Sequence, residues 1–374
     1  MNAETHGPEG VSICGPQCSS VSRTAQRPTM ALNVDVAAGR YRAMIGVGGI
    51  GTGVFFAVSG NHTLGREESR LGRFLDRRDY CKLHIISHYV STLLGPGFTT
   101  LPVGKVGDDE AGTRLLEEMR QAGMVTRYVQ VCPGKPTLSG ICIVYPDGSG
   151  GNLTTEDSAC AQVDPAYVAA VEPEFARFRG HGIVLAAPEV PLAAREEALR
   201  LGTVYGFLRV ASFNSQEIVI ADNAGMLSTV DLLAINADEA AALAGVEAEK
   251  RRPDEIAWAA VERLRATNPG MLLSVTAGRH GSWSWDGHDL AHVPALPVPV
   301  ASTAGAGDAH LAGIIVGLAA GLPLGEAHYL GALVAALSVT SPHTINKDIN
   351  RESLLRLARE VAQALPARVM SLLE

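Results

Sequence analysis

Four short apolar segments in the second half of the chain alternate with stretches of helical character, and this pattern limits the fold more than any other feature. The segments are residues 182–186, 207–212, 232–236 and 272–276. Strands separated by helices form βαβ units, whose strands lie parallel in one sheet that helices cover on both faces. The sequence therefore predicts a doubly wound α/β domain with a mostly parallel sheet.

The first half of the chain adds strands of a different kind. A helix is predicted over residues 80–94, where apolar residues recur at helical spacing, and residues 66–78 are predicted to be an exposed polar segment. Further strands are predicted at residues 43–47, 54–59, 99–103, 128–131 and 137–145. Turn residues surround the last two, which indicates a hairpin, so we expect a small β-sheet lid beside the main domain.

Length and composition suit one large α/β domain with an insertion, or two domains, and the order of the predicted strands favours the single domain. Of the 374 residues, 47% are hydrophobic and 19% are charged. Residues 1–40 lack periodicity, which predicts a mobile N-terminal arm before a domain at 41–374. The net charge of −8 argues against nucleic acid or an anionic membrane as the main partner, and the apolar window at 311–322 is too short to span a membrane. The six scattered cysteines suit reduced thiols in a cytoplasmic protein.

The strongest indication of function is Gly305-Ala306-Gly307-Asp308, which opens an apolar helix. The N–H groups of such a turn lack intrahelical partners, so they form a site for an anion. A carboxylate there would repel the anion, and Asp308 is better explained as a base that takes a proton from an attacking hydroxyl. Phosphoryl transfer to an alcohol needs this combination. The alternative is a glycine-rich turn with an Asp near a helix N-terminus.

Two further polar motifs follow predicted strands. Asn236 and Glu239 come after the strand at 232–236, where Glu239 could organise Mg²⁺ through its waters; an ordinary helix cap is the alternative. Thr276 and Gly278 follow the strand at 272–276, and a simple strand connection explains them equally well. Because ligands bind at the carboxyl ends of strands in doubly wound sheets, we expect these loops and the Asp308 turn to form one site.

Taken together, the chain resembles the ribokinase-like (phosphofructokinase-B type) family of sugar and nucleoside kinases over roughly residues 43–365. Residues 104–109, followed by a helix capped at Asp108, and Pro136-Thr137 also match the family pattern. The resemblance implies a ribokinase-like fold and ATP-dependent phosphorylation of a hydroxyl on a small sugar-like or nucleoside-like acceptor. The resemblance also implies that strands within about 54–59 and 126–146 form the lid over the acceptor, and the family suggests a homodimer formed through this lid.

The resemblance also implies roles for the motif residues. Asp308 would activate the acceptor hydroxyl, while the amides of Gly305, Ala306 and Gly307 would hold developing phosphate charge. Asn236 and Glu239 would manage Mg²⁺ and phosphate, and Thr276 and Gly278 would line the nucleotide side. The competing hypothesis is a catalytically silent ligand-binding or regulatory protein on the same scaffold.

The chain departs from the family pattern where the acceptor should bind. The usual Gly-Gly…Asn motif before Gly104 is replaced by residues 79–88, and the acceptor-binding Asp expected after the first strand is absent. In that place, Lys82, His84 and His88 are candidates for contact with the acceptor, with an exposed helix face as the alternative. The acceptor therefore stays open between a nucleoside, a phosphorylated sugar and an unusual polyol. Ser302 replaces an Asp associated with a monovalent-cation site, which puts potassium activation in doubt.

Overall fold

The computed structural model describes residues 31–147, 150–361 and 365–374, and in these ranges the chain forms a nine-stranded and a four-stranded sheet. The large sheet has the order β13-β12-β11-β10-β9-β8-β1-β4-β5, and all of its neighbouring strands are parallel except at β12 and β13. The predicted doubly wound fold is confirmed. Its strands are β1 (Ala43–Val47), β4 (Thr99–Gly107), β5 (Val129–Cys132), β8 (Gly182–Ala186), β9 (Leu208–Ala211), β10 (Leu232–Asn236), β11 (Leu272–Thr276), β12 (Ser282–Trp285) and β13 (Leu290–Val293).

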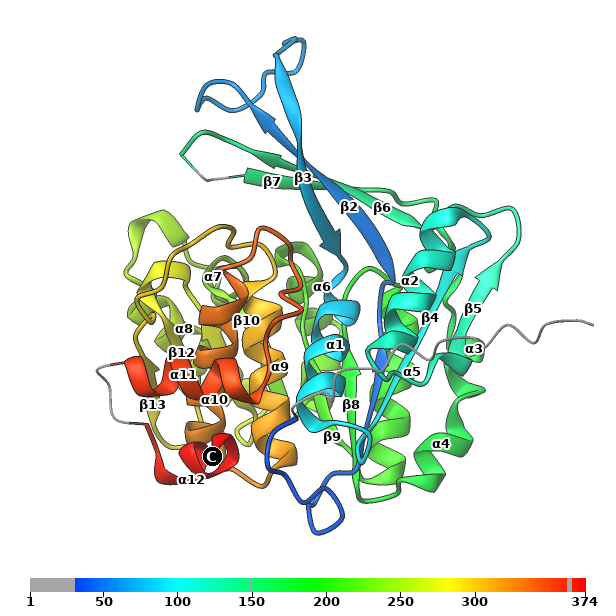
Figure 1. The fold of residues 1–374 in the computed structure, drawn as a ribbon, viewed down its shortest axis with the longest axis vertical. Helices are drawn as coiled ribbons and strands as arrows, with labels where there is room; N and C mark the ends of the chain where they lie inside the picture. Colours follow the sequence, from blue (N-terminus) through cyan, green and yellow to red (C-terminus); the bar gives the residue numbers. More distant parts are fainter. Residues whose placement is uncertain (1–30, 148–149, 362–364) are drawn as a thin grey trace, which may run out of the picture.

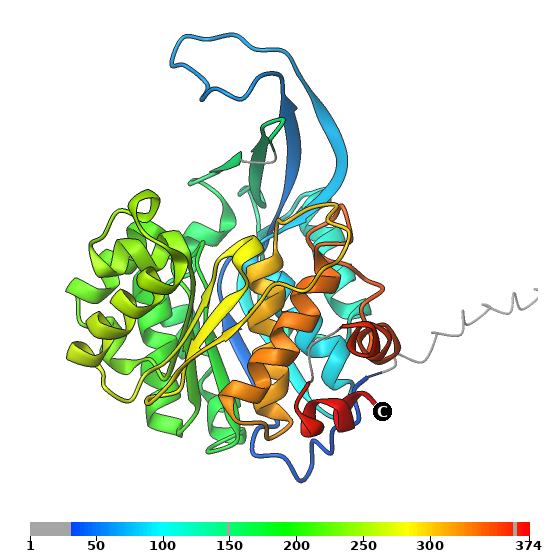
Figure 2. The ribbon, with the colours of Figure 1, turned by 90° about the vertical axis from the view of Figure 1, so that its left-hand side faces the viewer.

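Helices cover both faces of the large sheet, as Figures 1 and 2 show. One buried apolar cluster joins the sheet to α1 (Lys82–Leu94), α2 (Glu110–Gln121), α9 (Ala306–Ala319), α10 (Leu324–Ser338), α11 (Arg351–Glu360) and α12 (Ala367–Leu373). A second cluster joins it to α3 (Pro165–Ala169), α4 (Glu172–Arg177), α5 (Leu192–Tyr205), α6 (Ser215–Asn223), α7 (Ala237–Ala244) and α8 (Pro253–Thr267). Short 3₁₀ helices lie at Thr126–Tyr128, Ala159–Gln162, Met226–Thr229, Ala248–Lys250 and Gly278–His280.

Helix α9 is buried on nearly all sides because it packs against both α1 and α10. Its close approach to α10 depends on two glycines: a Cβ on Gly313 would lie only 2.6 Å from the Cα of Gly331. A helix enclosed in this way must be apolar around its whole circumference, which explains the apolar run that follows Asp308. The packing holds the N-terminus of α9 at a defined position near the carboxyl ends of β10 and β11.

The small sheet has the order β3-β2-β6-β7 and projects from one end of the domain (Figure 1). Its strands are β2 (Gly51–Val58), β3 (Gly72–Tyr80), β6 (Leu138–Val144) and β7 (Gly150–Thr154). Strand β3 forms within the segment that was expected to be only polar and exposed, because pairing with β2 satisfies its backbone. Residues 128–131, expected in the lid, also need correction: β5 pairs in parallel with β4 and extends the large sheet.

Two other boundaries differ from the sequence prediction. The N-cap of α2 is Asp109 rather than Asp108, since the Asp109 carboxylate accepts the N–H of Gly112 at 2.8 Å. Within the predicted arm, residues 1–30 lie outside the described residues, while Leu32 and Val36 are buried in the apolar core. The N–H of Leu32 also donates to the carbonyl of Leu93 at 2.8 Å, so the domain begins before residue 41. Among the described helices, none is long and apolar enough to cross a membrane.

Candidate active site

The N-terminus of α9 presents free backbone donors beside Asp308. Gly305 is the N-cap with φ of +78°, a conformation that glycine adopts without strain. The N–H of Ala306 donates to Thr303, and the N–H of Ala309 donates to Gly305. Between them, the N–H groups of Gly307 and Asp308 have no backbone partner among the described residues. Of the three amides that the sequence assigned to an anion site, those of Gly305 and Gly307 lack a backbone partner among the described residues, whereas that of Ala306 is engaged by Thr303 and is not available.

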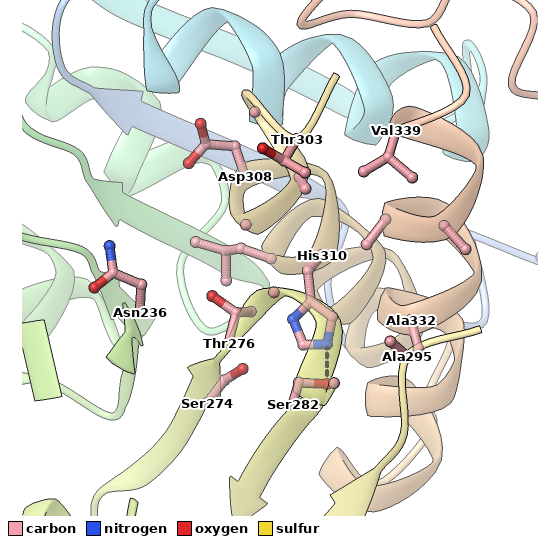
Figure 3. Close-up of a pocket in the computed structure, with 18 of the residues that line it drawn as sticks. Asn236, Ser274, Thr276, Ser282, Ala295, Thr303, Asp308, His310, Ala332 and Val339 are labelled. Carbon is pink, nitrogen blue, oxygen red and sulfur yellow. Dashed lines mark hydrogen bonds between the residues drawn. The ribbon is translucent and has the colours of Figure 1, made fainter. Parts of the chain in front are cut away.

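A cavity of about 480 Å³ lies in front of this turn. In Figure 3, Asn236, Thr276 and Asp308 lie on one side of it, and Ala332 and Val339 lie on the other. Asn236 and Thr276 are direct partners in the parallel pairing of β10 and β11, which is why both motifs reach the same cavity. Gly278 also lines it. The cavity thus combines a polar end near Asp308 with an apolar slot formed by α10 and residues 293–300.

Asn236 and Glu239 form a reciprocal cap at the start of α7. The Asn236 side chain accepts the N–H of Glu239 at 2.8 Å, and Glu239 Oε2 accepts the N–H of Asn236 at 2.8 Å. The alternative interpretation as a helix cap is therefore correct for the local structure. Both residues nevertheless line the large cavity, and Glu239 Oε1 takes no part in the cap. Burial raises the pKa of Glu239, although Lys82 opposes this shift.

A buried polar cluster stands in the wall of the same cavity. Ser282 Oγ lies 3.1 Å from His310 Nε2 and 2.7 Å from His328 Nε2, and the first contact is dashed in Figure 3. Burial holds the pKa of His310 well below its usual range, so the imidazole is neutral at pH 7. A neutral imidazole can act as donor or acceptor, and the cluster adds the only histidine among the described residues that line the cavity.

Lys82, the first residue of α1, lies beside Asp308. Its Nζ is 3.6 Å from Asp308 Oδ1 and donates to Ser212 Oγ at 3.1 Å. Burial raises the pKa of Asp308 while Lys82 lowers it, and the net shift is upward. Burial lowers the pKa of Lys82, but the carboxylates around it outweigh that effect and keep the ammonium charged. Lys82 and Asp308 thus form a polar pair that is largely shielded from water.

A second cavity, of about 220 Å³, lies between this pair and the small sheet. Lys82, Gly305 and Asp308 line both cavities, so they stand at the junction. Sequence reasoning missed the carboxyl groups of Asp79 and Glu189, which also line the smaller cavity. The position of Glu189 directly after a buried strand was a usable signal, because polar residues at the carboxyl end of such strands face ligands. Asp79, on a strand that was not predicted, had no such signal.

His84 and His88 do not reach either cavity in the described structure. Their exposed fractions are 1% and 8%, and their rings pack edge-on against Tyr80 and Tyr89 respectively. Burial lowers the pKa of each histidine to about 3. Successive helical residues turn by about 100°, so Lys82 can face the cavities while the histidines of the same helix face the protein interior.

Metal-binding clusters are missing from the part of the chain that the structure describes: no three His, Cys, Asp or Glu side chains lie close enough to hold an ion by themselves. This agrees with Mg²⁺ chemistry, in which one or two carboxylates act together with water and substrate phosphates. Of the six cysteines, the four that the structure describes are free thiols.

The sequence is similar to one known protein family and to several known proteins. Residues 90–351 match the model of the pfkB family of carbohydrate kinases. A ribokinase from Schizosaccharomyces pombe is 26% identical over 225 residues, which is 59% of this chain and 68% of that protein. The bifunctional protein HldE of Nitrobacter hamburgensis is 30% identical over 222 residues, 56% of this chain; the match spans only 42% of that relative.

Solved structures share the whole architecture. A nucleoside kinase from Burkholderia thailandensis in complex with inosine has a TM-score of 0.67 at 17% identity, covering 85% of this chain and 97% of that one. The ribokinase of Arabidopsis thaliana, complexed with ribose and ATP, has a TM-score of 0.65 at 19% identity and covers 85% of this chain and 98% of its own. At these identities the likeness shows a common fold.

Proposed function

Because the chain belongs to the pfkB family of carbohydrate kinases, we propose that it transfers the γ-phosphoryl group of ATP to a hydroxyl of a small sugar-like or nucleoside-like acceptor. The observation that carries this proposal is the position of Asp308, which lines both cavities. The larger cavity has the mostly apolar lining with a polar end that suits a nucleotide, and the lining of the smaller one is more polar in proportion. A base at the junction of the two cavities lies between the phosphoryl donor in the larger cavity and the acceptor in the smaller one.

In this proposal, Asp308 accepts the proton of the acceptor hydroxyl as that oxygen attacks phosphorus. Burial raises the pKa of Asp308, which makes its carboxylate a stronger base than an exposed one. The free N–H groups of Gly307 and Asp308 stabilise the charge that develops on the transferring group. The Lys82 ammonium, which faces both cavities, adds to that stabilisation and orients the Asp308 carboxylate.

The larger cavity fits a nucleotide in chemistry. Its apolar slot suits a nucleobase, and the N-terminus of α9 suits phosphate oxygens, with Thr276 and Gly278 on the same side. Bound with ATP, Mg²⁺ would neutralise phosphate charge. Asn236 and the free oxygen of Glu239 would hold its water ligands.

ADP formation from Mg-ATP, measured across sugars, sugar phosphates, nucleosides and polyols, tests this function. We expect at least one acceptor to be phosphorylated by the wild-type chain and by no more than a trace in Asp308→Asn. Tight ATP binding with no turnover on any acceptor would favour the silent ligand-binding alternative. Turnover that survives in Asp308→Asn would refute the role of this residue.

We also propose that the chain forms a homodimer through the outer face of the small sheet. The side chains of Val54, Ile141 and Leu153 are neighbours in the strand pairing, and 43%, 42% and 60% of their surface is exposed. Phe74, 69% exposed, extends the same apolar face by packing on Phe56. Strand alternation turns polar residues such as Asn152 toward the smaller cavity and leaves this apolar face for a partner.

A further inference from the structure

The smaller cavity has an unusual balance of charge. Three carboxyl groups line it, from Asp79, Glu189 and Asp308, against the single ammonium of Lys82. No arginine and no second lysine are present among the described residues of its lining. Lys82 is already engaged, with Asp308 at 3.6 Å and Ser212 at 3.1 Å. The cavity therefore offers acceptors of hydrogen bonds in excess of donors.

Asp79 reaches this cavity from β3, across the small sheet. It pairs in register with Gly53 of β2, and a Cβ on Gly53 would lie 2.5 Å from Asp79 Oδ2. The glycine thus makes the space that the carboxylate occupies. The thiol of Cys142 donates to Oδ2 at 3.1 Å. The N–H of Tyr80 and the hydroxyl of Thr344 also interact with this carboxylate. A carboxylate has about four acceptor positions, so Asp79 can still accept a hydrogen bond from a ligand.

Glu189 supplies independent support for a ligand in this place. Its Oε2 atom is shielded from solvent and has no hydrogen-bond partner in the described structure. The residue also has a φ of +74°, a strained conformation for a residue other than glycine. A shielded carboxylate oxygen without a partner is unfavourable, and strain of this kind gathers at ligand sites. A bound molecule with donor groups would satisfy this oxygen.

These carboxyl groups are spread around the cavity rather than gathered on one point. Within the described residues they form no group able to hold a metal ion. A ligand that brings hydroxyl donors would satisfy these groups, whereas a phosphate or carboxylate would face three carboxyl groups with one shared cation. Neither Arg66 nor Arg70 lines the cavity, and Arg70 is bound to Glu68 at 2.7 Å. Arg114 donates to the lining residue Thr52 at 3.2 Å but does not itself line the cavity.

We infer that the acceptor is a hydroxyl-rich molecule without phosphate or carboxylate, and that Asp79 binds it by accepting a hydrogen bond from one of its hydroxyls. This inference rests on the proposed function, since it treats the smaller cavity as the acceptor site. It narrows the three acceptor classes that the sequence left open by excluding the phosphorylated sugar. It also assigns to β3 a carboxylate contact that the turn after β1 does not supply.

Binding is measured first without ATP, by calorimetry on matched pairs: ribose and ribose 5-phosphate, fructose and fructose 6-phosphate, adenosine and adenosine 5′-monophosphate. We expect at least one uncharged member to bind the wild-type chain, with at least tenfold preference over its phosphate ester. Asp79→Asn should weaken that binding at least tenfold, because a hydrogen bond to a charged acceptor is lost. Asp76→Asn, on an exposed residue of the same strand, is the matched control and should bind as the wild type does.

Kinetics on the same pairs separate this inference from the proposed function. Asp79→Asn should raise KM for the acceptor at least tenfold while kcat stays within about threefold, as expected for a group that binds without reacting. Binding of uncharged acceptors without any ADP formation would contradict the proposed function alone. Three results would each overturn the inference. The wild-type chain could prefer a phosphate ester, or it could bind none of the uncharged members. The third result is an affinity of Asp79→Asn equal to that of the wild type.

Discussion

Replacement of Asp308 by Asn separates the catalytic role of the carboxylate from its effect on stability. Two influences on the ionised Asp308 oppose each other: burial disfavours the charge, and Lys82 at 3.6 Å favours it. At an effective dielectric constant of about 20, that attraction amounts to about 5 kcal/mol. The pKa of Asp308 is nevertheless raised, so burial outweighs the attraction and the ionised carboxylate is less favourable in the folded chain than in the unfolded one. A neutral amide of the same shape should therefore not destabilise the fold at pH 8.

The effect on the reaction should be large and in the opposite direction. Loss of a general base costs about 10²–10⁴-fold in rate, equivalent to about 3–5 kcal/mol in the activation barrier. We expect kcat to fall by this factor in Asp308→Asn, while the affinity for ATP changes less than about threefold and the melting temperature at pH 8 is equal or higher. Coupled ADP release, nucleotide titration and thermal unfolding measure the three quantities.

A control on an exposed carboxylate makes the comparison specific. Asp348→Asn, which changes a residue on the surface, should leave all three quantities as in the wild type. A kcat within tenfold of the wild type would refute the role of Asp308 as base. A large drop in melting temperature would instead show that the attraction to Lys82 outweighs burial, contrary to the reasoning above.

Three other changes test separate parts of the structure. Gly305→Ala should lower the free energy of unfolding, measured in urea, by at least about 1–2 kcal/mol, because φ is +78° and a Cβ would lie 2.9 Å from the Thr344 carbonyl oxygen. The control Gly270→Ala should not cause this loss, since a Cβ there meets no neighbour within 4 Å. Burial raises the pKa of Glu189 to about 7, so between about pH 4.5 and 7 this group is ionised in the unfolded chain only, and the free energy of unfolding falls as the pH rises. Glu189→Gln should remove that fall. A dependence of the unfolding free energy on pH that the substitution leaves unchanged would contradict this. Ile141→Lys should convert the proposed dimer to a monomer in light scattering, while Val204→Lys, on an exposed residue of α5, should not; a wild-type monomer would refute the dimer.

Local patterns in the sequence were sufficient for the parallel core of the fold. Strands β8, β10 and β11 lie at the predicted positions, because a strand buried on both faces must be a short, continuous apolar run. The same holds for the turn of Gly305 to Asp308, where a glycine with positive φ, free N–H groups and the apolar run after them are all local properties. The site motifs at Asn236 and Thr276 were found because parallel strands end at one edge of a sheet.

The small sheet could not be predicted in the same way. Strand β3 contains charged, largely exposed residues and exists because β2 offers it a backbone partner. Strand β5 was assigned to the wrong sheet because its sequence shows that it is a strand and not which strand it pairs with. Nothing in the sequence of α1 distinguished Lys82, which faces both cavities, from His84 and His88, which are buried in the core.

The sequence by itself determined the doubly wound domain and the turn that places Asp308 at the N-terminus of α9, since both depend on residues that are close together along the chain. Only the tertiary structure decided the composition of the smaller cavity, which we propose as the acceptor site. Asp79, Glu189 and Asp308 come from three distant segments, and they meet because the packing of α1, α9 and the small sheet brings them to one cavity. Charges interact strongly only when they lie close together, so the excess of carboxyl groups in this cavity exists only in the assembled fold.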